Sequence, residues 1–274
     1  MSVLTQVGRV APALAAEVAW RAWRNVGAPE SVHPRDRLVH DRAVVSQLDS
    51  GVVTYQWGSG SRVILLVHGW RSRASRFSAI IAALEAPDAT VVAFDAPANG
   101  DSPGRFITIL DYMSAIQGIA DRFGVIDTII GHSFGALSAF TAVREGVRVR
   151  RIVSLAGMSG AVQLITAFSA AAGLTAGTER RMRRLIENRT FRGIPNIWSR
   201  FLAEVDPADS WMPLLVVHDE SDPVVDVSHS VLIAEAHTGP VRSLITSGLG
   251  HNRLLGDPEV VAAIRDFSRV PVPR

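Results

Sequence analysis

The sequence predicts an α/β fold in which a mostly parallel β-sheet is covered by helices on both faces. Almost every residue is apolar in six short runs, at 63–67, 90–94, 128–130, 152–155, 214–217 and 241–245. Segments with helical spacing of apolar residues lie between most of these runs. Short apolar strands that alternate with helices are typical of a parallel sheet buried on both faces. The length of 274 residues is enough for one large domain or two small ones.

The elements follow one another in a consistent order. Residues 13–23 predict a helix, and the connector at 28–41 is rich in proline and charge. The β-like runs at 43–48 and 52–57 are close enough to form an antiparallel hairpin. Apolar residues spaced three or four apart predict three further helices. These helices are marked by Ile80, Ile81 and Leu84, by Ile109, Met113, Ile116 and Ile119, and by Leu137, Phe140 and Val143.

One connection in this alternation is too long for an ordinary crossover. No apolar strand appears between residues 158 and 212, where 161–174 is rich in alanine and 179–187 has an apolar face. A crossover between neighbouring strands needs far fewer residues. The sequence therefore predicts an inserted helical cap at 158–212 over the carboxyl edge of the sheet. Residues 1–157 and 213–274 would form the core, with 1–40 as an N-terminal helical extension.

Composition excludes several classes of protein. Apolar residues make up 47% of the chain and charged residues 20%, which is a globular rather than a disordered balance. The absence of cysteine excludes disulfide frameworks, thiolate metal sites and a cysteine nucleophile. Neither a His-Glu-x-x-His pattern nor an EF-hand loop occurs, so we expect no bound metal.

Charge and hydropathy favour neither a nucleic-acid partner nor a membrane span. All 28 basic residues are arginines, and 26 acidic residues leave a net charge of only +2. The cap contains an arginine run, which we interpret as a solvated face in preference to an anion- or membrane-binding patch. No apolar stretch approaches the roughly 18–20 residues of a membrane-spanning helix, so we expect a soluble, cytoplasmic protein. The run consists of Arg180, Arg181, Arg183, Arg184, Arg189 and Arg192.

A strand running into a helix through Gly-x-Ser-x-Gly marks a candidate nucleophile. The pattern occupies residues 131–135, so that Ser133 stands at the corner between strand and helix. Such a corner turns so sharply that it needs small residues two positions either side of the serine. The corner also leaves the Phe134 N–H at a helix N-terminus, where a developing oxyanion is favoured. A near miss at 157–161, centred on Ser159, does not match the full pattern.

A serine nucleophile needs a base, and the base needs an acid that orients it. The run 214–217 leads into a loop with three acidic candidates, Asp219, Asp222 and Asp226, of which the first could cap a turn and the last a helix. The run 241–245 leads to His251, and glycines precede this histidine. The order serine, acid, histidine is the one found when this chemistry is built on a doubly wound sheet. By contrast His33, His40, His229 and His237 have no nucleophile or metal context.

With these motifs the chain resembles the α/β-hydrolase superfamily, specifically its cap-bearing serine esterases, from about residue 43 to the C-terminus. The segment 65–70, Leu-Leu-Val-His-Gly-Trp, is similar to the family's His-Gly oxyanion loop. The segment 94–102 is similar to its Asp-x-x-Gly-x-Gly-x-Ser loop, although Ala98 and Asn99 replace the usual Gly-His. Asp222 and His251 fall where the family keeps its acid and base.

The resemblance implies an eight-stranded sheet and a set of residue roles. Ser133 would be the nucleophile, His251 the general base, and Asp222 the acid that orients the imidazole. The backbone N–H groups of Trp70 and Phe134 would hold the oxyanion. The substrate pocket would be lined in part by His68, Gly69 and His132. No cofactor or metal is implied.

The expected reaction is hydrolysis of a small carboxylic ester through an acyl-enzyme. A serine in the nucleophile position argues against haloalkane dehalogenase and epoxide hydrolase chemistry. Thioesterase, lactonase, carbon–carbon bond hydrolase and perhydrolase reactions stay open, because all can use this triad. The alternative from another class is a catalytically silent binding protein with a hydrolase fold, or an arginine-rich binder of polyanions. The sequence predicts neither the substrate's chain length nor the oligomeric state.

Overall fold

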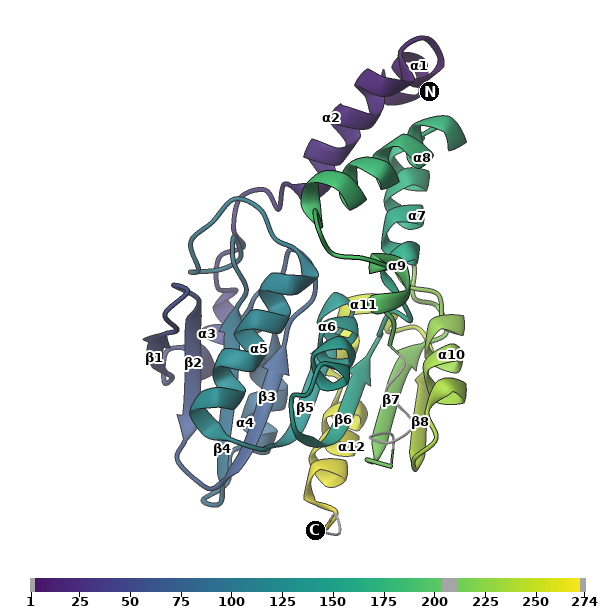
Figure 1. Cartoon of the computed structure of the whole chain (residues 1–274). Coiled ribbons are helices and arrows are strands. Elements are labelled where there is room, and N and C mark those ends of the chain that lie inside the picture. Colours follow the sequence, from purple (N-terminus) through teal and green to yellow (C-terminus); the bar gives the residue numbers. More distant parts are fainter. Residues whose placement is uncertain (1–2, 204–210, 272–274) are drawn as a thin grey trace.

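A single mixed β-sheet organises the molecule (Figure 1). The computed structural model describes residues 3–203 and 211–271. Across the sheet the strands follow the order β1 (Val44–Gln47), β2 (Val53–Gly58), β4 (Ala89–Asp95), β3 (Arg62–Val67), β5 (Ile126–His132), β6 (Val149–Leu155), β7 (Leu214–Asp219) and β8 (Val241–Thr246). β2 is antiparallel to both of its neighbours, β1 and β4, and every other neighbouring pair is parallel. The predicted hairpin and the eight-stranded, mostly parallel sheet are confirmed.

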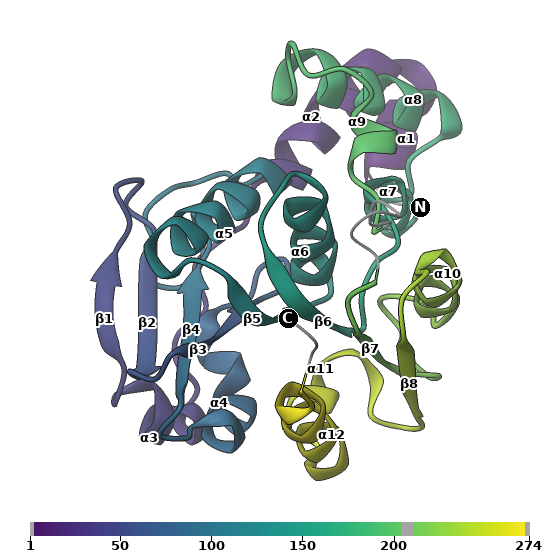
Figure 2. The ribbon, with the colours of Figure 1, turned by 60° about the horizontal axis from the view of Figure 1, so that its bottom comes forward.

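Helices cover both faces of this sheet, as Figure 2 shows. One face carries α4 (Ser78–Leu84) and α12 (Pro258–Arg269), and the other carries α5 (Ile109–Phe123), α6 (Phe134–Arg144) and α10 (Ser228–Ala236). The shorter helices are η1 (Pro34–Asp36), α3 (Arg37–His40), η2 (Ala74–Phe77), α11 (Gly250–Arg253) and η4 (Leu254–Gly256).

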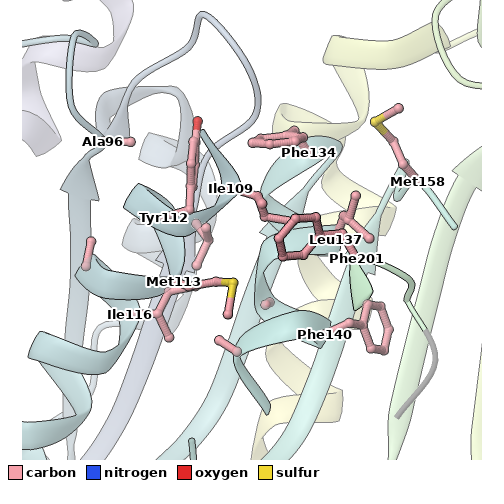
Figure 3. Packing of buried hydrophobic residues seen from close by; sticks show 14 of the residues in the cluster. Ala96, Ile109, Tyr112, Met113, Ile116, Phe134, Leu137, Phe140, Met158 and Phe201 are labelled. Carbon is pink, nitrogen blue, oxygen red and sulfur yellow. The ribbon is translucent and has the colours of Figure 1, made fainter. Parts of the chain in front are cut away.

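The alternating side chains of the strands create two cores. In β3, Val63, Leu65 and Val67 point into the core beside α5 and α6, whereas Ile64 and Leu66 point into the core beside α4 and α12. Successive side chains of a strand face opposite sides of the sheet, so a strand buried on both faces must be apolar throughout. Figure 3 shows part of the first core, with its side chains from α5 and α6. The continuous apolar runs of the sequence have this physical cause.

The N-terminal helices pack against helices inserted between β6 and β7. Both figures place α1 (Val3–Val10) and α2 (Pro12–Arg24) beside the inserted segments (Figures 1 and 2). These are α7 (Ala161–Ala172), α8 (Ala176–Leu185), η3 (Ile186–Thr190) and α9 (Ile197–Arg200), which we call the inserted helices. The Trp20 indole N–H donates to Thr190 Oγ1 at 2.9 Å, and Arg189 pairs with Glu17 at 2.8 Å. The expected insertion at 158–212 also includes 204–210, which lie outside the described residues. Within the described ranges, no helix is both long and apolar enough to cross a bilayer.

Candidate active site

Ser133 stands at a strained corner between β5 and α6. Its backbone has φ 55° and ψ −118°, a conformation that costs an L-amino acid roughly 1–3 kcal/mol. The corner is possible because the positions two residues before and two residues after Ser133 are both glycine. A Cβ on Gly131 would lie 2.4 Å from Ala136 Cα, and one on Gly135 would lie 2.1 Å from the Val67 carbonyl oxygen. The requirement for small residues at these two positions is therefore steric and absolute.

The peptide between Gly69 and Trp70 is held in a fixed orientation just beyond β3. The Gly69 carbonyl oxygen accepts hydrogen bonds from the Tyr112 hydroxyl at 3.0 Å and from His68 Nδ1 at 2.7 Å. His68 Nε2 accepts the Ala96 N–H at 2.9 Å, so Nδ1 must carry the proton of this ring. In a trans peptide the N–H points away from the carbonyl. The Trp70 N–H is therefore directed away from Tyr112 and His68.

Asp222, in the loop after β7, is the acid that contacts His251. Its Oδ2 lies 2.7 Å from His251 Nδ1, and its Oδ1 accepts the N–H groups of Val224 and Val225 at 2.8 and 3.0 Å. The side chain is completely buried. Burial opposes its ionisation, but bonds from His218, His251 and the two N–H groups outweigh burial and hold the pKa of Asp222 well below its usual range. Asp222 is therefore an anion that fixes the imidazole.

The two rival acids have other partners. Asp219 Oδ2 accepts the Leu249 N–H and the Thr246 hydroxyl, each at 2.8 Å, and so anchors the segment that leads to His251. Burial disfavours its charge, yet these and further N–H donors lower the pKa of Asp219. Asp226 Oδ1 accepts the Ser228 N–H at the start of α10. Of the three acids that the sequence left open, Asp222 alone contacts His251.

His218 is a second, buried histidine beside Asp222, and no sequence motif had assigned it a role. Its Nε2 lies 2.8 Å from the Val225 carbonyl oxygen and 3.4 Å from Asp222 Oδ2, and its Nδ1 lies 2.6 Å from Ser230 Oγ. These contacts brace the loop on which Asp222 stands. Its place immediately before Asp219, at the end of an apolar strand, was the signal that could have revealed it.

His251 lies beside the corner that carries Ser133. Its ring is 4.8 Å from the His132 ring, and His132 Nε2 lies 3.0 Å from the His251 carbonyl oxygen. No hydrogen bond joins the Ser133 hydroxyl to the His251 imidazole, although the structure describes both residues. Bonds between nucleophile and base are often long without substrate and tighten in the reacting complex. The structure thus brings the Asp222–His251 pair against His132, the residue that precedes Ser133.

Because His132 is buried and neutral, we expect the stability of the fold to depend on pH through this residue. Burial, together with the neighbouring His251, lowers the pKa of His132 from 6.5 to about 3. Between these values only the unfolded chain binds the proton, so stability is lost as the pH falls through this window. The loss from this residue is about 1.4 kcal/mol per pH unit. We expect the unfolding free energy, measured by urea titration between pH 6 and 4, to change less steeply with pH in His132→Gln than in wild type, by this amount. Equal slopes in the two proteins would contradict the assignment.

Ser159 and His229 form another serine–histidine contact, away from Ser133. Ser159 Oγ lies 2.8 Å from His229 Nδ1, and both residues are partly exposed. The expectation that His229 has no nucleophile context is therefore wrong, because residues 70 positions apart meet where the inserted helices leave the sheet. Burial lowers the pKa of His229, which keeps its ring neutral. In the described part of the chain this pair has no carboxylate bonded to its histidine, unlike His251.

Other possible binding features do not involve these residues. In the described ranges no three His, Asp or Glu side chains are grouped as metal ligands. A cleft of about 470 Å³ lies against α3, α4 and η4, with Arg35, Arg76 and Arg253 among its lining residues. None of the triad candidates lines this cleft, and neither Trp70 nor Phe134 does, so it lies outside the candidate site.

Comparisons with known proteins agree with the fold. A family model described as "Alpha/beta hydrolase family" matches residues 64–264. An esterase from Pyrococcus furiosus is 19% identical over 89% of this chain and 98% of its own, with a TM-score of 0.60. An esterase from Rhodococcus sp. ECU1013 is 17% identical over 83% and 98% of the two chains, with a TM-score of 0.56. Mouse alpha/beta hydrolase domain-containing protein 10 is 15% identical over 82% and 96%, with a TM-score of 0.61. No curated protein sequence matches the chain.

Proposed function

The chain belongs to the alpha/beta hydrolase family, and from this premise we propose that it is a serine hydrolase that cleaves carboxylic esters with Ser133, His251 and Asp222. The observation that carries the proposal is the buried Asp222 carboxylate 2.7 Å from His251 Nδ1, with the His251 ring against His132, the residue before the strained Ser133. These residues follow β5, β7 and β8, whose carboxyl ends meet at one edge of the sheet. Esterases among the structures of similar fold support the choice of ester substrates.

Each group has one task in the proposed reaction. Ser133 Oγ attacks the carbonyl carbon while His251 Nε2 takes its proton, and Asp222 stabilises the resulting imidazolium. The N–H groups of Trp70 and Phe134 hold the oxyanion, and each such donor is worth roughly 3–4 kcal/mol of transition-state stabilisation. His251 then gives its proton to the departing alcohol. Water attacks the acyl-enzyme with His251 again as the base, which releases the acid and restores Ser133.

The test is to identify the serine that reacts with a fluorophosphonate. We expect a single adduct on Ser133, located by mass spectrometry of the digested protein, together with turnover of a short p-nitrophenyl ester. An adduct on Ser159 would instead assign the chemistry to the Ser159–His229 pair. Neither labelling nor turnover would favour the silent binding protein. Thioester and lactone substrates run in parallel distinguish the other reactions that the same triad supports.

Tyr112 is expected to act on the rate through the peptide that it orients. Tyr112→Phe removes one of the two side-chain donors to the Gly69 carbonyl and leaves the ring packing of this buried residue in place. Because the Trp70 N–H acts chiefly in the transition state, kcat should fall by about tenfold while KM changes little.

A purely structural role for Tyr112 would give a different pattern. Affinity for a trifluoromethyl ketone, which binds as a tetrahedral adduct, should weaken by the same factor as kcat/KM in the Tyr112→Phe variant. A loss of thermal stability with unchanged kcat and unchanged inhibitor affinity would contradict the positioning role.

A further inference from the structure

A small apolar cavity lies between the core, the inserted helices and α2. Its volume is about 20 Å³. Every lining side chain except Thr108 is apolar, and the wall includes Trp23, Trp70, Phe134 and Trp198. A space of about 10–15 Å³ suffices for one water molecule, so this cavity admits a group no larger than a methyl or two.

Two residues that line the cavity also carry the proposed oxyanion donors. Trp70 and Phe134 both line it, and their rings meet edge to face with centroids 5.3 Å apart. In the proposed reaction the alcohol is protonated by His251 and must leave on that side. The cavity adjoins the proposed site through Trp70 and Phe134, the second of which follows Ser133 directly, and none of the three triad residues lines it. We therefore assign the cavity to the acyl chain that Ser133 carries, and the opposite side, where His251 lies, to the alcohol.

Trp23 closes this cavity from the N-terminal extension. Its ring stacks on Trp70 with centroids 6.0 Å apart and an interplanar angle of 16°, and the residue is 7% exposed. Among the described residues its buried indole N–H has no hydrogen-bond partner. Packing alone therefore holds the ring in place. The helix itself is tied to the inserted helices through Trp20 and Glu17, as described above.

We propose that Trp23 sets the upper limit of acyl length, so that the enzyme prefers acetyl and propionyl esters over longer ones. The inference rests on the ester hydrolysis proposed above and adds the substrate class. The N-terminal extension thus takes part in selecting the substrate, together with the inserted helices. The apolar wall gives no partner to a charged or polar acyl group, which restricts the class further to unsubstituted short acyl chains.

The test compares p-nitrophenyl acetate, butyrate and octanoate, which share one leaving group, on the full chain. Wild type should have its highest kcat/KM with acetate. Trp23→Ala removes the wall and should raise the octanoate-to-acetate ratio of kcat/KM by at least about tenfold. Trp23→Phe keeps an aromatic ring and should move the ratio in the same direction by less.

Trp20→Ala is the matched control. Trp20 is on the same helix, is equally exposed at 7%, and does not line the cavity. Its substitution should leave the ratio within about twofold of wild type, because it widens no part of the acyl site. An equal shift in Trp20→Ala would overturn the proposal, since attachment of α2 rather than the bulk of Trp23 would then decide the preference.

The outcomes separate this inference from the proposed function. A wild-type enzyme that hydrolyses octanoate better than acetate, or a Trp23→Ala ratio equal to wild type, overturns the inference and leaves ester hydrolysis standing. No turnover of any ester, with no fluorophosphonate adduct on Ser133, overturns the proposed function and the acyl limit with it.

Discussion

Ser133→Ala should lower kcat for ester hydrolysis by at least about 10⁴-fold, the largest effect expected of any single substitution in this chain. The substitution removes the atom that forms the acyl-enzyme, while Ala fits the corner no worse than Ser does. The oxyanion donors and the pocket remain, so a small residual rate over water is expected. Initial rates with p-nitrophenyl acetate measure the loss directly.

Ser159→Ala is the control for this loss. Ser159 also contacts a histidine, at 2.8 Å, and is more accessible than Ser133. If Ser133 is the nucleophile, Ser159→Ala should keep kcat within a few-fold of wild type. A reversed result, with activity lost in Ser159→Ala and kept in Ser133→Ala, would contradict the assignment.

Asp222→Asn should lower kcat by about 10³- to 10⁴-fold with the backbone unchanged. The carboxylate accepts the proton of His251 Nδ1, whereas an amide placed there presents an N–H and favours the wrong imidazole tautomer. The amide also leaves the imidazolium without a counter-charge. Steady-state kinetics at pH 7 to 8 give the magnitude.

Asp226→Asn provides the comparison within the same loop. Asp226 is exposed, and an asparagine oxygen can still accept the Ser228 N–H. Its kcat should stay within about twofold of wild type, since exposed positions without special contacts are usually insensitive. Equal losses in the two variants would indicate that loop structure, and not the charge of Asp222, controls the rate.

The sheet and the corner could be predicted because their causes are local. A strand buried on both faces is apolar at every position, and the glycines two residues either side of Ser133 follow from the sharp turn of the chain there. The atoms that leave no room for a side chain are local at Gly131, which meets Ala136, but belong to Val67 of β3 at Gly135. The loop after β4 shows the limit of such patterns. Ala98 has a φ of 63°, in the left-handed region that favours glycine, and the family usually has glycine at this position. The turn therefore forms here although the alanine side chain disfavours it.

The remaining features depend on partners that are distant in the chain. Tyr112 fits the apolar face of α5, and nothing near it in sequence shows that its hydroxyl reaches Gly69, 43 residues away. The pattern of α2 likewise shows which of its faces is apolar, but not that the inserted helices cover that face. The spacing of apolar residues shows which face of a helix is buried. Which part of the molecule covers that face follows only from the tertiary structure.

The contact between α2 and the inserted helices also sets an order of events during protein synthesis. Trp20 leaves the ribosome 170 residues before Thr190, its partner. At about 5–20 residues per second, the helix waits roughly 10 to 30 s before its docking surface exists. During that interval its tryptophans face the solvent or a chaperone. A nascent chain stalled before α7 therefore carries an uncovered, aggregation-prone α2, although most strands of its sheet have already been made.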